Sequence, residues 1–174
     1  SNVHFILKRL QRLTGGFQVV AASATISNPQ EFCEALFGKR FTVVSGGEGR
    51  HGRIHFALLF PTLRSHRTLV VDLLKNLTSS NYRPIVFSSS HLGAELTAFY
   101  GRRGGVDVEV HRAGLLPGHR KRVEEMFKRG LLKAVSATPT LELGIDIGGV
   151  DAIISDLVPV TRLIQRTGRA ARRG

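Results

Sequence analysis

Cysteine and long apolar runs are nearly absent from this chain. Its 174 residues contain one cysteine, Cys33, so no internal disulfide can form and a reducing compartment is expected. Apolar runs such as residues 56–60 are far too short to cross a bilayer, and no signal peptide is apparent. We therefore expect a protein that is neither secreted nor membrane-bound and that lies in the cytoplasm, the nucleoid or the nucleus.

Acidic residues and clustered metal ligands are also scarce. Only 13 Asp and Glu oppose 25 Lys and Arg, which leaves a formal net charge of +12. This excess favours a polyanionic partner, most simply nucleic acid, although an acidic membrane surface would suit the charge equally well. His51 and His55 are four residues apart without a cysteine or carboxylate cluster beside them, so we expect no metal site.

The residues that are abundant predict an α/β fold. Hydrophobic residues make up 42% of the chain, which is typical of a globular protein with a core of its own. Apolar stripes at helical spacing predict helices near residues 3–13, 29–37, 69–77, 92–99, 117–130 and from 161 onward. Short apolar runs predict strands at residues 17–22, 40–44, 54–60, 84–87, 106–111, 133–136 and 151–155. Strands separated by helices indicate a parallel sheet with helices on both faces.

One segment has the composition of a linker. Residues 45–53 read SGGEGRHGR and contain four glycines but no apolar side chain. We therefore expect residues 1–44 and residues 54–174 to belong to different structural units.

Small polar side chains follow several of the predicted strands. Three serines follow residues 84–87, His-Arg-Ala-Gly begins at His111, Thr138 follows residues 133–136, and Ser155-Asp156 closes the last strand. The carboxyl ends of parallel strands meet at one edge of a sheet, where ligands gather. Hydroxyls there can simply cap helices, but in a chain of charge +12 the whole set favours phosphate binding.

The last ten residues, Gln165–Gly174, are rich in arginine. In a helix, Gln165, Arg169 and Arg172 would share one face because they lie at i, i+4 and i+7. Guanidinium groups make planar, bidentate contacts with phosphate. The alternative is a solvated basic tail, although such a tail needs neither Gln165 nor Gly168 at fixed places.

Five segments, in order, resemble the later motifs of superfamily 2 DEAD/DEAH-type helicases of the Lhr and Ski2-like kind. They are SAT (residues 23–25), PIVFSSS (84–90), HRAG (111–114), ATPTLELGID (137–146) and QRTGRAARRG (165–174). The resemblance covers nearly the whole chain. It implies two RecA-like domains of the P-loop NTPase type, with ATP in the cleft between them and nucleic acid lying across both.

On this resemblance, residues 1–44 form the end of the first, ATP-binding RecA-like domain, and residues 54–174 form most of the second, the helicase C-terminal domain. The resemblance assigns nucleic-acid backbone contacts to Ser88, Arg112, Gly114 and Thr138. The partner implied is single- or double-stranded nucleic acid, DNA or RNA. Most of the ten phenylalanines occupy apolar periodic positions and are expected in the core, which favours backbone tracking over base stacking.

The resemblance also implies how the chain contributes to ATP hydrolysis. Gly144 and Asp146 match a loop that faces the nucleotide, and Ser23 and Thr25 match a motif that couples the ATP state to domain closure. The three catalytic candidates lie in the last motif: Gln165, Arg169 and Arg172. An arginine finger of this kind neutralises charge that develops in phosphoryl transfer.

Two departures from the helicase pattern limit these expectations. Ala171 stands where glycine is usual, and a methyl group there could crowd a close domain contact. The 174 residues also contain no Walker A loop and no DEAD or DEAH tetrad, which hold ATP and Mg²⁺. We therefore expect a fragment of a longer enzyme that neither binds ATP tightly nor hydrolyses it alone, and whose exposed apolar faces favour dimerisation or domain swapping.

Two other functions are compatible with parts of the sequence. A RecA-like fold could serve as a non-catalytic basic module that only holds nucleic acid. A dinucleotide-binding oxidoreductase would need G-x-G-x-x-G at the first strand-to-helix turn, and the glycines at 144, 148 and 149 have a different spacing.

Overall fold

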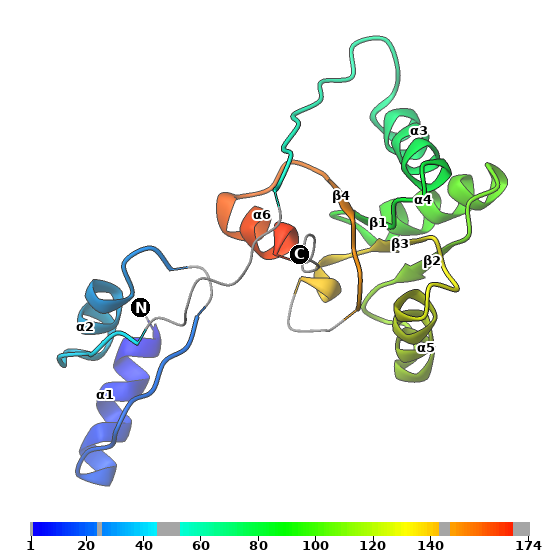
Figure 1. The fold of residues 1–174 in the computed structure, drawn as a ribbon. Coiled ribbons are helices and arrows are strands. Elements are labelled where there is room, and N and C mark those ends of the chain that lie inside the picture. The colour runs from blue at the N-terminus through cyan, green and yellow to red at the C-terminus, as the bar shows by residue number, and fades with distance from the viewer. Residues whose placement is uncertain (1, 24–25, 45–52, 143–146, 169–174) are drawn as a thin grey trace. The chain divides into compact units, whose positions relative to one another are not determined.

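The chain divides into two compact units, Ser1–Gly49 and Arg50–Gly174. A computed structural model describes residues 2–23, 26–44, 53–142 and 147–168 (Figure 1). Each unit is considered by itself. None of the helices among the described residues combines the length and the apolar character needed to cross a bilayer.

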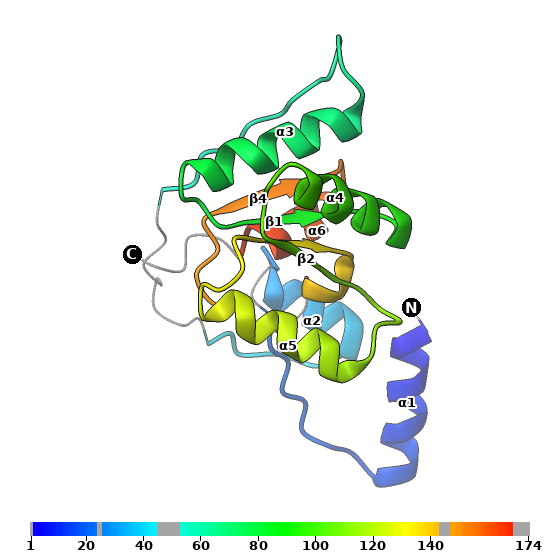
Figure 2. The same cartoon turned by 90° about the vertical axis from the view of Figure 1, so that its right-hand side faces the viewer.

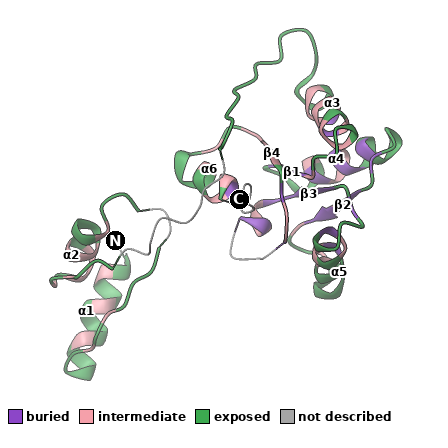
Figure 3. Cartoon of the chain, in the orientation of Figure 1, coloured by how far each residue is buried: buried purple, intermediate pink, exposed green. Residues whose placement is uncertain are grey.

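The first unit consists of two helices that pack on each other, α1 (Asn2–Thr14) and α2 (Pro29–Phe37). His4 Nδ1 lies 2.6 Å from the Leu36 carbonyl oxygen and joins them. Neither helix has a buried residue, whereas buried side chains gather in the second unit (Figure 3). The two helices alone therefore do not enclose a core.

The strands predicted at residues 17–22 and 40–44 are wrong. Both segments lack regular secondary structure, and Val20 is 86% exposed. A strand is stable only when a neighbouring strand accepts and donates its backbone hydrogen bonds. The described part of the first unit contains no such neighbour, so apolar character alone does not produce a strand.

The second unit is built on four parallel strands in the order β2-β3-β1-β4. In chain order they are β1 (Pro84–Phe87), β2 (Val108–His111), β3 (Ala134–Ala137) and β4 (Ala152–Ser155). Their bounds agree with the predicted strands to within two residues, and the predicted parallel sheet is confirmed.

Helices cover both faces of this sheet (Figure 2). The helices α3 (His66–Ser79) and α4 (His91–Arg103) pack on one face and α5 (Pro117–Lys128) on the other. The remaining helical elements are the 3₁₀ turn η1 (Pro139–Leu141) and α6 (Val160–Thr167). This arrangement confirms the predicted fold class.

Alternate strand residues face two separate cores, as the pleat requires. Val86, Val108 and Ala134 pack with Leu74 of α3 and with α4. On the other face, Ile85, Phe87 and Val135 pack with Phe127 of α5. Because all four strands are parallel, the loops that leave their carboxyl ends lie along one edge of the sheet.

The strand predicted at residues 54–60 is also wrong, because this segment is exposed and pairs with no described strand. The expectation that most phenylalanines lie in the core is also wrong. Phe87 and Phe127 are buried, but five others are at least 46% exposed: Phe5, Phe32, Phe56, Phe60 and Phe99.

Candidate nucleic-acid interface

The carboxyl ends of β1 and β4 and the amino ends of α3 and α4 enclose a pocket of about 440 Å³. Its apolar lining includes Val86 and Ile154. The polar or small lining residues are Ser65, His66, Arg67, Ser88, Ser89, Ser90, Gly93, Thr97, Ser155 and Asp156. The predicted gathering of hydroxyls at one sheet edge is therefore present between these two strands.

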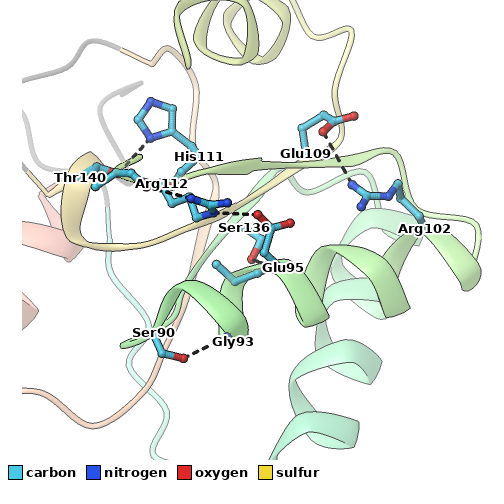
Figure 4. A network of polar contacts seen from close by, with 11 residues as sticks. Ser90, Gly93, Glu95, Arg102, Glu109, His111, Arg112, Ser136 and Thr140 are labelled. Carbon is cyan, nitrogen blue, oxygen red and sulfur yellow. Dashed lines mark hydrogen bonds and ion pairs between the residues drawn. The ribbon is translucent and has the colours of Figure 1, made fainter. Parts of the chain in front are cut away.

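The amino end of α4 is built to leave space beside Ser88. The Ser90 hydroxyl accepts a hydrogen bond from the Gly93 N–H at 3.0 Å and caps the helix (Figure 4). A Cβ on Gly93 would lie 3.0 Å from Ser90 Oγ and 3.4 Å from Ser88 Cβ. Glycine therefore keeps open the side of the pocket where Ser88, itself only 8% exposed, lies.

The amino end of α3 adds an imidazole and a guanidinium to the pocket. Ser65 caps the helix by accepting the Thr68 N–H at 3.1 Å, and His66 and the exposed Arg67 follow it. Helix amino ends and a guanidinium both favour a bound anion. The sequence did not suggest His66 or Arg67, because only the fold brings residues 65–67 beside residues 88–90.

One carboxylate, that of Asp156, lies beside these side chains. Its Oδ2 accepts the Ser89 N–H at 3.1 Å and its Oδ1 lies 3.4 Å from His66 Nε2. Asp156 thus ties the loop after β4 to the loop after β1 and to α3. The guanidinium of Arg67 and the two capped helix amino ends remain available to a bound phosphate.

The other predicted nucleic-acid contacts lie farther along the same edge. Arg112 Nε donates to Glu95 Oε1 at 2.7 Å, which fixes the loop that follows β2 (Figure 4). Gly114 has a φ of +83°, a conformation that favours glycine. Thr138 is 3% exposed and its N–H donates to the His111 carbonyl at 3.1 Å.

The strand order separates Arg112 from Ser88. Because β3 lies between β2 and β1, their ends are two strand spacings apart, or about 10 Å. Neither Arg112, Gly114 nor Thr138 lines the pocket that contains Ser88. A ligand that touches all of these residues must extend along the edge, as a nucleic-acid backbone can.

His111 is fully buried and holds the loops behind this edge in place. Its Nε2 lies 2.8 Å from Glu124 Oε1 of α5, and its Nδ1 lies 3.0 Å from Thr140 Oγ1. Burial lowers the pKa of His111 below 6.5, with Arg120 acting in the same direction and Glu124 opposing it. In the neutral ring, Nε2–H donates to Glu124 and Nδ1 accepts the Thr140 hydroxyl.

Among the described residues, Arg166 is the largest that is fully buried, and no pattern in the sequence predicted its burial. Its Nε donates to Glu142 Oε1 at 2.7 Å and its Nη1 donates to Ser155 Oγ at 2.6 Å. Nη2 also lies 2.7 Å from Glu142 Oε1 but is not aligned for a hydrogen bond, so that contact is electrostatic. The guanidinium carbon lies 4.8 Å from the centre of the Phe87 ring.

The remaining predicted site residues are only partly accounted for. Gln165 is half-buried on α6, and Ser23 is exposed in the first unit. The final helix, predicted from residue 161 onward, is present as α6, Val160–Thr167. Five candidates lie outside the described residues, namely Thr25, Gly144, Asp146, Arg169 and Arg172.

The sequence from residue 65 to residue 174 matches the family described as the helicase conserved C-terminal domain. The chain belongs to this family. Among curated relatives, it is 36% identical over 173 residues to an uncharacterised ATP-dependent helicase of Methanocaldococcus jannaschii, covering 97% of the chain and 25% of the relative. It is 32% identical over 190 residues to the uncharacterised ATP-dependent helicase YprA of Bacillus subtilis, covering 99% of the chain and 25% of YprA.

Solved helicase structures share this fold. The helicase MrfA bound to DNA and AMPPNP superposes with a TM-score of 0.77 at 30% identity, covering 98% of the chain and 27% of MrfA. Helicase Lhr of Mycobacterium smegmatis bound to ssDNA and AMP-PNP superposes with a TM-score of 0.69 at 28% identity, covering 98% of the chain and 24% of Lhr. The resemblance to Lhr-like helicases and the RecA-like fold are confirmed, and the chain spans about a quarter of these relatives.

Proposed function

We propose that this chain is the nucleic-acid-binding and arginine-bearing part of an ATP-dependent helicase or translocase. The observation that carries the proposal is the pocket at the ends of β1 and β4. Two capped helix amino ends, the buried Ser88 and the cationic Arg67 converge there, and each favours a phosphate. Arg112, Gly114 and Thr138 extend the interface along the same sheet edge.

The substrate is nucleic acid held by its backbone, and single-stranded DNA is the first choice. Two of the similar helicases were solved with DNA, one of them with a single strand. The pocket is lined by hydroxyls, the guanidinium of Arg67 and two helix amino ends, and Phe87, which also lines it, is only 1% exposed and so offers no face on which a base could stack. Such groups contact phosphate and do not distinguish bases.

ATP and Mg²⁺ are required by the intact protein. The roles proposed for Gln165, Arg169 and Arg172 are contacts with the transferred phosphate, and Gly144 and Asp146 would face the nucleotide. Ser23 and Thr25 would couple ATP state to domain closure. The residues that hold ATP and Mg²⁺ belong to motifs that these 174 residues do not contain, so the chain alone is expected to be inactive.

The domain assignment completes this proposal. Residues 1–44 would end the first RecA-like domain, residues 45–53 would link the domains, and residues 54–174 would form the second. The exposed apolar side chains of α1 and α2 would then be covered by the rest of the first domain, or by a second copy in isolation. A helicase of this type acts inside the cell, in the cytoplasm or the nucleoid or nucleus.

The decisive experiment compares ATP hydrolysis by the chain alone and by the protein that includes the upstream nucleotide-binding domain. We expect DNA-stimulated hydrolysis only in the longer protein, and its loss in the Arg169→Ala variant. ATP hydrolysis by the 174-residue chain would refute the expectation that the chain alone is inactive. DNA binding without any turnover in the longer protein would favour the alternative of a non-catalytic nucleic-acid-binding module.

A further inference from the structure

Arg166 is the arginine of the last motif that lies within the described residues, and it is enclosed by protein. Its side chain is 1% exposed and its charge is met by Glu142, whose side chain is 6% exposed. An arginine loses its hydration when it is buried this completely, and such a residue is stable only with a carboxylate and hydrogen-bond acceptors around it. Glu142 and Ser155 supply both.

These contacts join three separate parts of the second unit. Arg166 lies on α6, Glu142 directly follows η1, and Ser155 ends β4. The planar guanidinium also lies over the ring of Phe87 at the end of β1. A single side chain therefore sets the position of α6 relative to the edge of the sheet.

The sequence places both ends of this ion pair next to the proposed nucleotide contacts. Glu142 comes two residues before Gly144, and Arg166 comes three residues before Arg169. Movement of either residue would be passed along the backbone to the segment that follows it.

We infer that Arg166 is a positioning residue: through Glu142 and Ser155 it fixes α6 so that the arginines after it reach the transferred phosphate in a productive geometry. This inference rests on the proposed function. Arg166 cannot itself be a phosphate-contacting arginine in this arrangement, because its guanidinium is enclosed and already bound to a carboxylate and a hydroxyl. A displacement of about 1 Å in a catalytic group can lower the rate about 100-fold.

Loss of stability must be separated from loss of positioning. Removal of one partner from a buried ion pair leaves an uncompensated charge, so Arg166→Met or Glu142→Leu alone should lower Tm by about 10 °C or more. Replacement of both partners by apolar residues of similar volume is often neutral for stability. The double variant Arg166→Met with Glu142→Leu should therefore restore Tm to near that of the wild type.

The experiment measures DNA-stimulated ATP hydrolysis and Tm in the intact two-domain protein. We expect the double variant to lose about 10- to 100-fold in kcat with little change in the KM for ATP. Arg162→Met is the matched control, since Arg162 lies on the same helix but is 52% exposed and 4.0 Å from Glu142 Oε2. Its kcat should stay within about twofold of the wild type.

A double variant that recovers both Tm and kcat would overturn the inference, because Arg166 would then serve stability alone. If the double variant does not fold, Arg166→Lys decides: it keeps the charge but loses the fork that reaches both Glu142 and Ser155. A lowered kcat in folded Arg166→Lys supports positioning, and an unchanged kcat refutes it. Absence of turnover in the wild-type protein would instead refute the proposed function.

Discussion

Replacement of Arg67 by glutamine tests whether the pocket between α3 and α4 binds a nucleic-acid phosphate. Arg67 is exposed at the rim of the pocket, so its full charge is available to a ligand. Glutamine is shorter than arginine but keeps a polar side chain and removes the charge.

The size of the effect follows from counterion release. Each phosphate neutralised on a single strand contributes about 0.7 to the slope of log K against log salt concentration. Loss of one contact should therefore weaken binding about 8-fold at 50 mM salt but only about 3-fold at 200 mM salt. The salt dependence of the Arg67→Gln variant should be shallower by about 0.7.

Fluorescence anisotropy of a labelled single-stranded oligonucleotide, titrated at several salt concentrations, measures this slope. Arg122→Gln is the matched control, because Arg122 is equally exposed but lies on α5, which covers the opposite face of the sheet. An unchanged slope in Arg67→Gln, or an equal reduction in both variants, would mean that the pocket is not the binding site and that the net charge alone attracts the strand.

Three further variants test the site and the fold around it. Gly93→Ala should weaken DNA binding while Tm stays close to that of the wild type, because the new Cβ would lie 3.0 Å from Ser90 Oγ. Gly118→Ala is the control: a Cβ there would have no atom within 4 Å, so DNA binding in the same anisotropy assay should be unchanged. Gly101→Ala should lower the free energy of unfolding, measured in urea, by about 1–3 kcal/mol, since its Cβ would lie 2.9 Å from Val108 Cγ1. An unchanged unfolding midpoint would refute this close packing. Burial lowers the pKa of His111, so below pH 6.5 the unfolded chain binds a proton that the folded chain excludes. The free energy of unfolding should therefore be highest above pH 6.5 and should decrease as the pH falls toward the pKa of the folded state. His111→Gln should flatten this acid-side decrease in thermal unfolding curves, and an identical pH profile would contradict the role of His111.

The sequence predicted well those elements whose apolar pattern and ends can be read from the order of residues. The helices α3, α4 and α5 have apolar stripes and clear ends, and each strand of the sheet lies in a short apolar run between them. Ser88 was placed correctly at the end of β1, because parallel strands bring their carboxyl ends to one edge wherever they pair.

The sequence could not predict which apolar runs would find a partner. Residues 17–22 and 54–60 have the same pattern as β1, but a strand exists only where another backbone completes its hydrogen bonds. The pattern records that a segment is apolar and does not record which segment lies beside it.

The sequence alone determined the fold class, the helicase motifs and the basic charge of this chain, because these depend on residue type and order. Only the tertiary structure decided what individual charged residues do. Arg67 and Arg166 are both arginines of a basic chain, yet Arg67 lies exposed at a pocket and Arg166 is enclosed with Glu142. The difference arises from contacts between residues that are distant in the chain, such as Arg166 with Glu142, 24 positions away, which no local pattern encodes.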